Sequence, residues 1–518
     1  MKKGLLRLQV FTTLLFLSHL AQAQVQDGGS GNLMAWLIPL AVLAAFIVLM
    51  RLTDRLPKKK QAASSAASNG SVVALKRGFD LHLDGDAEKR IDENVKATTF
   101  AVQPPNFRGI APIPKMLVEV GDTVLAGDPL FHDKINTSII YVSPVSGEVI
   151  AINRGERRAI HEVVILADRE QQYRELPMFD VNKSSRESLV SFLCECGGWT
   201  LLRQRPYDIV AQVKEVPENI FISTFDTAPL APDLDLVVQG KAQEFQEGLN
   251  VLAKLTSGKV HLGLNAATTP SEVFTKSTGV EKHWFSGKHP AGNVGTQIHH
   301  VDPIRPKDQV WTLGVQEVLT LGEIFTKRRF HAERIVAIAG AEVKEPKYVR
   351  TYLGANLGDL LKGNLKNEHV RIVSGDVLCG EKKAAANFLN YYDDQITVLE
   401  EGDYFETFGW LLPKKKAPTH SGTFAYPLFK KAFRADTNTH GERRAFVMTG
   451  EYESVLPMDV YPQHLMKAII ANDFEKMEGL GIHELIEEDV ALCEFVCTSK
   501  QPLQQILRQG LNTMHEQG

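Results

Sequence analysis

An uncharged apolar run near the N-terminus constrains the architecture of this chain more than any other feature. Residues 33–50, LMAWLIPLAVLAAFIVLM, contain no Asp, Glu, Lys, Arg or His. Their length is close to the roughly 20 residues that a helix needs to cross a bilayer, so we expect a transmembrane helix here. Because a path for ions through a membrane needs polar groups, this helix is expected to anchor the chain and not to conduct.

The residues around this run indicate how the chain is oriented. Residues 51–60, RLTDRLPKKK, carry five basic side chains, whereas the preceding QVQDGGSGN carries none. Basic residues favour the cytoplasmic side, so a single-pass anchor in the cell inner membrane is predicted to hold the globular body in the cytoplasm. Residues 1–23 are typical of a signal peptide, and residues 51–70 form a basic flank and a small, polar linker. Whether the first hydrophobic segment is cleaved stays open.

Composition indicates an ordinary globular body behind this anchor. The 518 residues are enough for about three or four domains. The 58 basic and 62 acidic side chains nearly cancel, so no nucleic-acid partner is expected. Five cysteines are too few for a disulfide framework and lack the spacing of a metal site. We expect buried, reduced thiols and no bound metal.

The first soluble region, residues 71–170, has the pattern of a barrel-sandwich domain like those of biotinyl and lipoyl carriers. Short β-rich runs, among them VVAL, MLVEV, IIYV, GEVIAI and HEVVIL, are separated by Gly, Asp, Asn and Pro. Such carriers hold their cofactor on a lysine at a hairpin tip, and Lys134 lies near that position. Because Lys134 follows Leu130 closely but lies far before Pro144, it is off the centre of the hairpin. A structural or docking module is therefore favoured over a biotin or lipoyl carrier of another membrane ion pump.

Helix and strand patterns alternate over residues 184–345, which predicts an α/β domain with a parallel or mixed sheet. EFQEGLNVLAKLTSGKVHLGL shows helical periodicity, a Ser-Gly stop and a strand. Residues 310–340 repeat this order and end in a buried-looking strand at 335–339. Only Gly340 follows that strand, and no phosphate-binding loop occurs, so NADH is not expected to bind here.

Two further regions complete the predicted α+β multidomain fold. Residues 346–415 place a short helix between β segments and resemble a β-grasp ligand-binding unit of electron-transfer subunits. Residues 416–518 are predicted to be a helical C-terminal region. There, Glu484, Glu487, Glu488 and Asp489 lie beside an apolar stripe and are interpreted as a solvated helix face.

The segment EKHWFSGKHPAGNVGTQIHH, residues 281–300, contains four histidines. A zinc site would need histidines three or four apart on a helix or on facing strands, which His283, His289 and the adjacent pair at 299 and 300 do not offer. Backbone amides near Gly292 and Gly295 could meet an anion, although the spacing is not that of a phosphate loop. A turn-rich connection is the simplest interpretation.

Eight stretches occur in an order that resembles a known family. They are GGWTLLRQRPY, FDTAPLAPD, VEKHWFSGKHPAGNVGTQIHHVDP, VRTYLGA, VLEEG, FGWLLP, GEYESVLPMDV and EEDVALCEFVC. From about residue 72 to the C-terminus, the chain resembles the A-subunit of the Na+-translocating NADH:quinone reductase. The predicted anchor is an addition to the usual pattern of that family.

The resemblance implies a place in a six-subunit membrane complex that passes electrons from NADH to quinone while exporting sodium. It implies that this chain holds no cofactor tightly and is not catalytic alone. NADH, FMN, riboflavin or FAD, and an iron-sulfur centre would belong to the other five subunits, with quinone as the substrate. On this basis, His283, His289, Gly292 and Gly295 are predicted to shape a quinone-proximal or subunit-docking surface.

Overall fold

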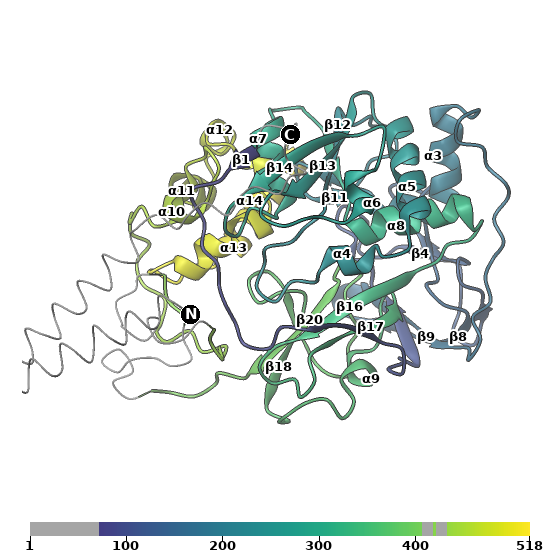
Figure 1. Cartoon of the computed structure of the whole chain (residues 1–518), viewed down its shortest axis with the longest axis horizontal. Coiled ribbons are helices and arrows are strands. Elements are labelled where there is room, and N and C mark those ends of the chain that lie inside the picture. The colour runs from purple at the N-terminus through teal and green to yellow at the C-terminus, as the bar shows by residue number, and fades with distance from the viewer. Residues whose placement is uncertain (1–71, 407–417, 421–431, 518) are drawn as a thin grey trace, which may run out of the picture. The chain divides into compact units, whose positions relative to one another are not determined.

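A computed structural model of the chain describes residues 72–406, 418–420 and 432–517 (Figure 1). The signal-like segment, the transmembrane helix predicted at residues 33–50 and the linker all lie outside the described residues. Within these residues, no helix combines the length and the apolar character needed to cross a membrane.

The barrel-sandwich region consists of two small antiparallel sheets. Their strand orders are β3-β9-β8-β5 and β4-β6-β7. The strands are β3 Thr99–Val102, β4 Lys115–Met116, β5 Thr123–Val124, β6 Pro129–His132, β7 Ile140–Val142, β8 Gly147–Arg154 and β9 Ile160–Ala167. Val163 and Ile165 alternate along β9 and are fully buried, as expected for one face of a strand turned to the core. The predicted barrel-sandwich fold is confirmed.

Two short strands near this region join other sheets. β1 (Val72–Ala74) pairs in parallel with β14, and β2 (Glu88–Asp92) pairs with β17. The run VVAL, predicted among the barrel strands, therefore lies at the edge of the α/β sheet, with Val72 opposite Trp284. A β-rich run predicts a strand from local residues, whereas its pairing partner depends on contacts far along the chain.

The α/β region is built on a seven-stranded mixed sheet with the order β1-β14-β13-β12-β15-β10-β11. The strands are β10 Arg203–Arg205, β11 Ile209–Val210, β12 Asn219–Ser223, β13 Lys259–Asn265, β14 Glu281–Ser286 and β15 Val310–Thr312. The helices are α3 Arg186–Glu195, α4 Leu234–Val237, α5 Ala242–Leu255, α6 Glu272–Thr275, α7 Val294–Val301 and α8 Val315–Thr326. Strands β12 to β15 run parallel, whereas β10 is antiparallel to both of its neighbours, β15 and β11. The predicted α/β domain is confirmed.

Helices α5 and α8 pack closely because each carries a glycine at the contact. A Cβ on Gly322 of α8 would overlap the carbonyl of Glu244 in α5, and one on Gly248 of α5 would overlap Val318 of α8. Such close backbone contact leaves little freedom to slide, since interiors are packed nearly as tightly as organic crystals. It therefore sets the position of the start of α8 beside the sheet.

The third sheet has six strands in the order β19-β18-β20-β16-β17-β2. Its elements are β16 Glu333–Ala339, β17 Lys347–Tyr352, α9 Leu357–Leu361, β18 Val370–Ser374, β19 Glu381–Lys383 and β20 Gln395–Glu400. The strand predicted at 335–339 is β16, which lies in this sheet and not in the α/β sheet. Its apolar sequence indicates burial, and burial is equally expected of a central strand in either sheet.

The C-terminal region is helical and has an apolar core of its own. Its helices are α10 Tyr452–Val455, α11 Pro462–Ile470, α12 Phe474–Gly479, α13 Glu487–Val496 and α14 Leu503–Gln517. All five cysteines of the chain are free, and four of them are buried. Cys379 is exposed, contrary to the expected burial, because it lies in the turn that leads from β18 to β19.

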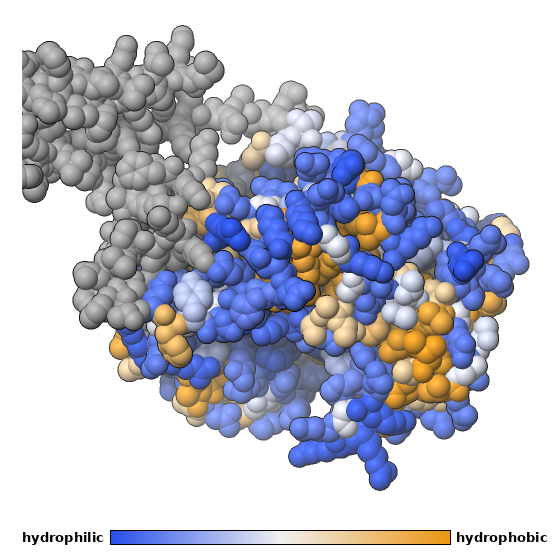
Figure 2. All heavy atoms as spheres, turned by 90° about the horizontal axis from the view of Figure 1, so that it is seen from below, coloured by the Kyte–Doolittle hydropathy of each residue, from blue (hydrophilic) through white to orange (hydrophobic). Residues whose placement is uncertain are grey.

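The face of the molecule shown in Figure 2 is mostly hydrophilic. Its hydrophobic patches are separated from one another by hydrophilic residues. Scattered apolar residues of this kind are normal on a soluble surface. The described part of this face therefore offers no large apolar binding surface.

Candidate functional site

Residues 281–300 form a strand, a turn and a helix, and not the turn-rich connection that was the simplest interpretation. β14 ends at Ser286 and α7 begins at Val294, so only residues 287–293 connect them. The four histidines of the segment have different partners. Among the described residues, no group of three or more His, Cys, Asp or Glu is placed to hold a metal ion.

His283 pairs with a histidine that the sequence pattern did not single out. Its Nε2 lies 2.9 Å from Nδ1 of His261, and Nε2 of His261 lies 3.2 Å from Oδ1 of Asn219. Because the Asn219 oxygen is an acceptor, His261 donates to it from Nε2 and accepts from His283 at Nδ1. Burial, together with the neighbouring His283, lowers the pKa of His261 to about 4. The pair is therefore neutral at pH 7.

His289 is a buried anchor in the turn between β14 and α7. Its Nδ1 lies 3.2 Å from the hydroxyl of Thr227, which also accepts a hydrogen bond from the Gly292 amide over 2.9 Å. The His289 amide donates to Oδ1 of Asp80 over 3.0 Å, and its carbonyl accepts from Phe79 over 2.9 Å. His289 thus holds the turn against two other segments of the chain.

The acids at the start of α13 form ion pairs and Asp489 is buried, which corrects their interpretation as a solvated helix face. Arg205 donates from Nη1 to Oδ2 of Asp489 over 2.9 Å and from Nη2 to Oε1 of Glu488 over 2.6 Å. The exposed fraction is 1% for the Arg205 side chain and 0% for that of Asp489. A Cβ on Gly295 would overlap the Asp489 carboxylate. Gly295 is therefore required by the close approach of α13 to α7.

The neighbouring acids also pair with basic groups. Glu487 accepts from Nε of Arg508 over 2.6 Å, and Glu484 accepts from Nδ1 of His299 over 2.6 Å. Nε2 of His299 accepts from the Asp459 amide over 2.9 Å, so this imidazole is neutral and carries its proton on Nδ1. The two contacts of His299 dock the C-terminal region on the α/β region, whereas the Glu487–Arg508 pair joins α13 to α14.

The α/β sheet reverses its strand order between β12 and β15. From β12, the chain continues to β13 and β14 on one side and returns to β15 on the other. In open α/β sheets, ligands bind outside the carboxyl ends of the strands at such a point. A cavity of 640 Å³ lies there, lined by Ser223 at the end of β12, Gly292 and Val294 at the start of α7, and Leu313 and Gly314 before α8.

Three other regions close this switch-point cavity. Arg108 comes from the barrel-sandwich region, Asp376 and Asp394 from the third sheet, and Glu487 and Glu488 from the C-terminal region. All parts of the described chain therefore meet at one place. Sites between domains are common positions for ligands and for contacts with partners.

Burial changes the ionisation of two carboxyls in the wall of the switch-point cavity. It raises the pKa of Glu488 to about 7, although Arg205 opposes this shift. It also raises the pKa of Asp394 to about 8, and the nearby Glu317 adds to this effect. Both carboxyls therefore exchange protons close to neutral pH.

The structure places the four predicted residues in different roles. Gly292 lines the switch-point cavity. His289 and Gly295 do not line the cavity but help to position the turn and the helix that do. His289 contacts Thr227, and Gly295 packs against the Arg205–Asp489 pair. His283 is paired with His261 and does not line the cavity.

Sequence reasoning missed the buried pair of Arg205 and Asp489 and its half-buried neighbour Glu488. The signal that contained them was the pair of family-like stretches GGWTLLRQRPY and EEDVALCEFVC, one basic and one acidic. Nothing in either stretch alone shows that the two meet, because the paired residues lie 284 positions apart.

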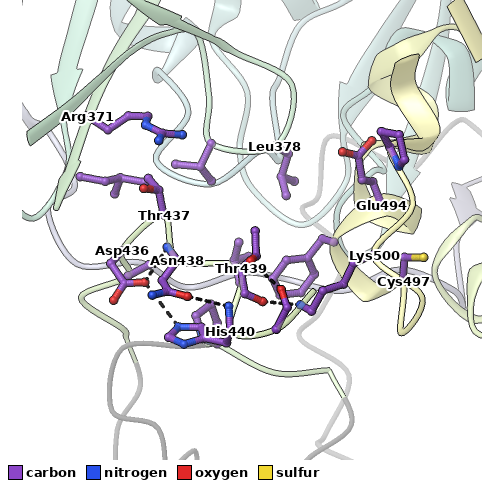
Figure 3. Close-up of a pocket in the computed structure, with 18 of the residues that line it drawn as sticks. Arg371, Leu378, Asp436, Thr437, Asn438, Thr439, His440, Glu494, Cys497 and Lys500 are labelled. Carbon is purple, nitrogen blue, oxygen red and sulfur yellow. Dashed lines mark hydrogen bonds and ion pairs between the residues drawn. The ribbon is translucent and has the colours of Figure 1, made fainter. Parts of the chain in front are cut away.

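A second cavity, of 1050 Å³, lies between the third sheet and the end of α13 (Figure 3). Its walls combine apolar residues such as Leu378 with polar residues such as His440 and Glu494. Its lining includes Pro418 and Thr419, which stand between stretches outside the described residues. The candidate site is therefore the switch-point cavity, whose walls are formed by described residues.

The barrel-sandwich, the mixed α/β sheet, the six-stranded sheet and the helical end define a multidomain α+β protein whose parts meet at one cavity. The chain matches three family models: the NqrA N-terminal barrel-sandwich hybrid domain at residues 73–168, the NqrA second alpha/beta domain at residues 184–330, and the NQRA C-terminal domain at residues 335–385.

Full-length relatives agree with these matches. The chain is 37% identical over 451 residues to the A-subunit of the Na(+)-translocating NADH-quinone reductase of Psychromonas ingrahamii and 39% identical over 452 residues to that of Saccharophagus degradans. Each alignment covers 86% of this chain and 100% of the relative. The chain belongs to the NqrA family, the A-subunits of the Na+-translocating NADH-quinone reductases.

Among solved structures, this chain aligns with an NAD+-reducing NiFe hydrogenase in the air-oxidized state. The alignment covers 65% of this chain and 64% of the hydrogenase chain. The sequence identity is 12% and the TM-score is 0.33. This similarity is too distant to bear on the fold.

Proposed function

We propose that this chain serves as the non-catalytic A-subunit of a membrane-bound Na+-translocating NADH:quinone reductase and contributes to quinone reduction coupled to sodium export. The observation that carries this proposal is the identity of 37% and 39% over the full length of relatives with that name. Matched domain models along most of the described chain support the same assignment.

We assign the redox cofactors to other subunits of the complex, of which five are expected. NADH, FMN, riboflavin or FAD, and an iron-sulfur centre would lie there, with quinone as the substrate. In a dinucleotide fold, the pyrophosphate binds at a helix start beside the switch point. Here Glu317 covers the start of α8: its carboxylate lies against Gly314 and accepts from Nη2 of Arg334 over 2.8 Å. A carboxylate at that position repels phosphate, which supports the assignment.

For localisation, we propose that the anchor predicted at residues 33–50 holds the described region at the cytoplasmic face of the inner membrane. The basic flank at residues 51–60 supports this orientation. The third sheet and the helical C-terminal region would then be the β-grasp-like and helical parts of a docking subunit.

For the predicted site, we propose that His289, Gly292 and Gly295 shape a subunit-docking surface at the rim of the switch-point cavity. Their contacts support a positioning role, since all three set the course of residues 287–295. His283, paired with His261, would act on this surface only through the position of β14.

The proposed function is tested by deleting the gene and measuring sodium-dependent NADH:quinone reductase activity in membranes. Loss of activity, restored by the full chain carrying an affinity tag, is expected. The tagged chain should also retain the other subunits on an affinity column. Full activity in the deletion strain, or a tagged chain that retains no other subunit, would contradict the proposal.

A further inference from the structure

We propose that the switch-point cavity is a socket for a basic segment of a partner subunit, with a lysine or arginine side chain entering it. This inference rests on the proposed function, because it requires that the chain work within a complex. It goes further by naming the place of contact and the chemistry of the partner. It follows from four observations on the described residues.

A carboxylate of the chain itself lies beside each of the helix starts that face the cavity. Asp489 accepts from the Ile486 amide over 2.9 Å at the start of α13 and lies against Gly295 near the start of α7. Glu317 covers the start of α8. Helix N-termini attract anions, and at these three the nearby anion is a carboxylate of the chain itself. A phosphate ligand therefore meets a carboxylate beside each of these three helix starts, which is an unfavourable charge.

The charges on the cavity wall favour a cation. Eight acidic and three basic residues line it. The three arginines, Arg108, Arg203 and Arg205, each form an ion pair with an acid. In contrast, the lining acids Asp226, Asp376 and Asp393 form no ion pair with any residue in the described part of the chain. Carboxylates without a counter-charge in a concave site attract a positively charged partner.

Two buried polar atoms of the wall have no hydrogen-bond partner. One of them needs a donor and the other needs an acceptor. Oδ1 of Asp394 accepts no hydrogen bond and has only an ion pair with Nε of Arg334 over 3.8 Å, and Nε of Arg205 is buried without an acceptor, among the described residues. Buried polar groups in proteins are nearly always paired. A basic peptide supplies both partners, because its ammonium or guanidinium group donates and its backbone carbonyl accepts. A simple polyamine offers donors alone, and a nucleotide places its phosphates among carboxylates.

The cavity also suits the shape of such a segment. Its volume of 640 Å³ lies within the range of about 300–1,000 Å³ typical of ligand pockets. Phe225 is one of its lining residues, and aromatic rings attract cations. Every region of the described chain contributes to the walls, so that one inserted segment contacts all of them. A partner segment could then bind in this socket only when those regions are correctly arranged around the cavity.

The direct test uses the purified full chain in detergent and isothermal titration calorimetry. The probe is the peptide Ac-Ala-Arg-Lys-Arg-Ala-NH2, compared with the same peptide carrying citrulline and norleucine in place of its basic residues. We expect the basic peptide to bind at least ten-fold more tightly. Spermidine and AMP are titrated in parallel, and tighter binding of either one than of the peptide would overturn the proposal.

The matched variants locate the binding. Asp226→Asn with Asp393→Asn keeps the acceptor oxygens that meet the Ala228 amide and the Ser374 hydroxyl but removes two charges. This pair should weaken peptide binding at least ten-fold. The control, Glu170→Gln with Glu475→Gln, removes two exposed charges outside the cavity and should bind as the unchanged chain does. Equal binding by both pairs would overturn the proposal, provided that thermal melting shows both to be folded.

The assembled complex separates this proposal from the function on which it rests. With an affinity tag on the chain, the Asp226→Asn/Asp393→Asn variant should retain less of the other subunits than the control pair at 200 mM NaCl, since charge contacts weaken with salt. If the unchanged chain retains the other subunits and the variant retains as much, the socket is wrong and the proposed function stands. If the unchanged chain retains none, the proposed function itself is wrong.

Discussion

The barrel-sandwich region and the junction around Arg205 are both buried, but they are held together in opposite ways. The barrel joins strands that are neighbours in sequence, such as β6 with β7 and β8 with β9, around side chains like Leu130, Phe131 and Ile165 that are fully buried. The junction joins Arg205 to Asp489, which lie 284 positions apart, through charges with almost no exposure. An apolar core tolerates many substitutions of similar volume. A buried charge, in contrast, becomes strongly destabilising when the opposite charge is removed.

The largest effect is expected at the junction. Arg205→Ala leaves Asp489 buried without its cation, which should destabilise the docking of α13 by about 3–5 kcal/mol. Native-state hydrogen exchange of the α13 amides in the full chain measures this loss. Lys476→Ala, which removes an exposed pair with Asp473, is the control and should leave the exchange of the α13 amides unchanged. Unchanged protection of α13 in Arg205→Ala would show that the pair does not hold the junction.

A substitution in the core of the barrel-sandwich region is expected to destabilise that region alone. Leu130→Ala removes a side chain with 0% exposure and should cost about 2–5 kcal/mol through lost burial and a cavity. The same exchange experiment should show faster exchange in β6 to β9 and an unchanged rate in α13. If α13 loses as much protection as the barrel, the two regions unfold as one unit and the contrast between them fails.

A smaller, pH-dependent effect is expected from the neutral histidine pair. The folded chain holds the pKa of His261 at about 4, below the usual value of about 6.5 for an unfolded chain. As the pH falls from 7 to 4, the unfolded state takes up a proton that the folded state does not, so stability should fall by about 2–3 kcal/mol. The loss begins near pH 6.5 and ends near pH 4. Urea unfolding at several pH values measures it, and His261→Gln should remove this part of the pH dependence; an equal slope in that variant would refute the assignment.

The last prediction is that Lys134, in the hairpin of the barrel-sandwich region, carries no covalent cofactor. Lys134 lies in the turn between β6 and β7 and is exposed, as a carrier lysine would be. We expect no biotin or lipoate on it, so the intact mass of the chain purified from its own cells should show no such adduct. An adduct lost in Lys134→Arg would make the barrel a carrier and would reverse its assignment as a structural or docking module.

Much of the fold was predictable, and the residues show why. The helix at 242–255 and the strand at 259–265 follow from an apolar periodicity that ends at Ser257 and Gly258. The barrel strands follow from β-rich runs broken by turn residues. The candidate site was predictable only in part: Gly292 lines the cavity, whereas His283 and His289, the most conspicuous residues of the segment, are packed against His261 and Thr227.

The sequence by itself determined the family, the barrel-sandwich and α/β folds, and the positions of several helices and strands, because each depends on local pattern or on ordered motifs. The tertiary structure alone decided that VVAL extends the α/β sheet, that β16 joins the third sheet, and that Asp489 is buried against Arg205. It also decided where the walls of the switch-point cavity meet. These outcomes depend on which distant residues come into contact, and in a chain of this length that choice is made by packing and charge pairing across regions, which no local pattern records.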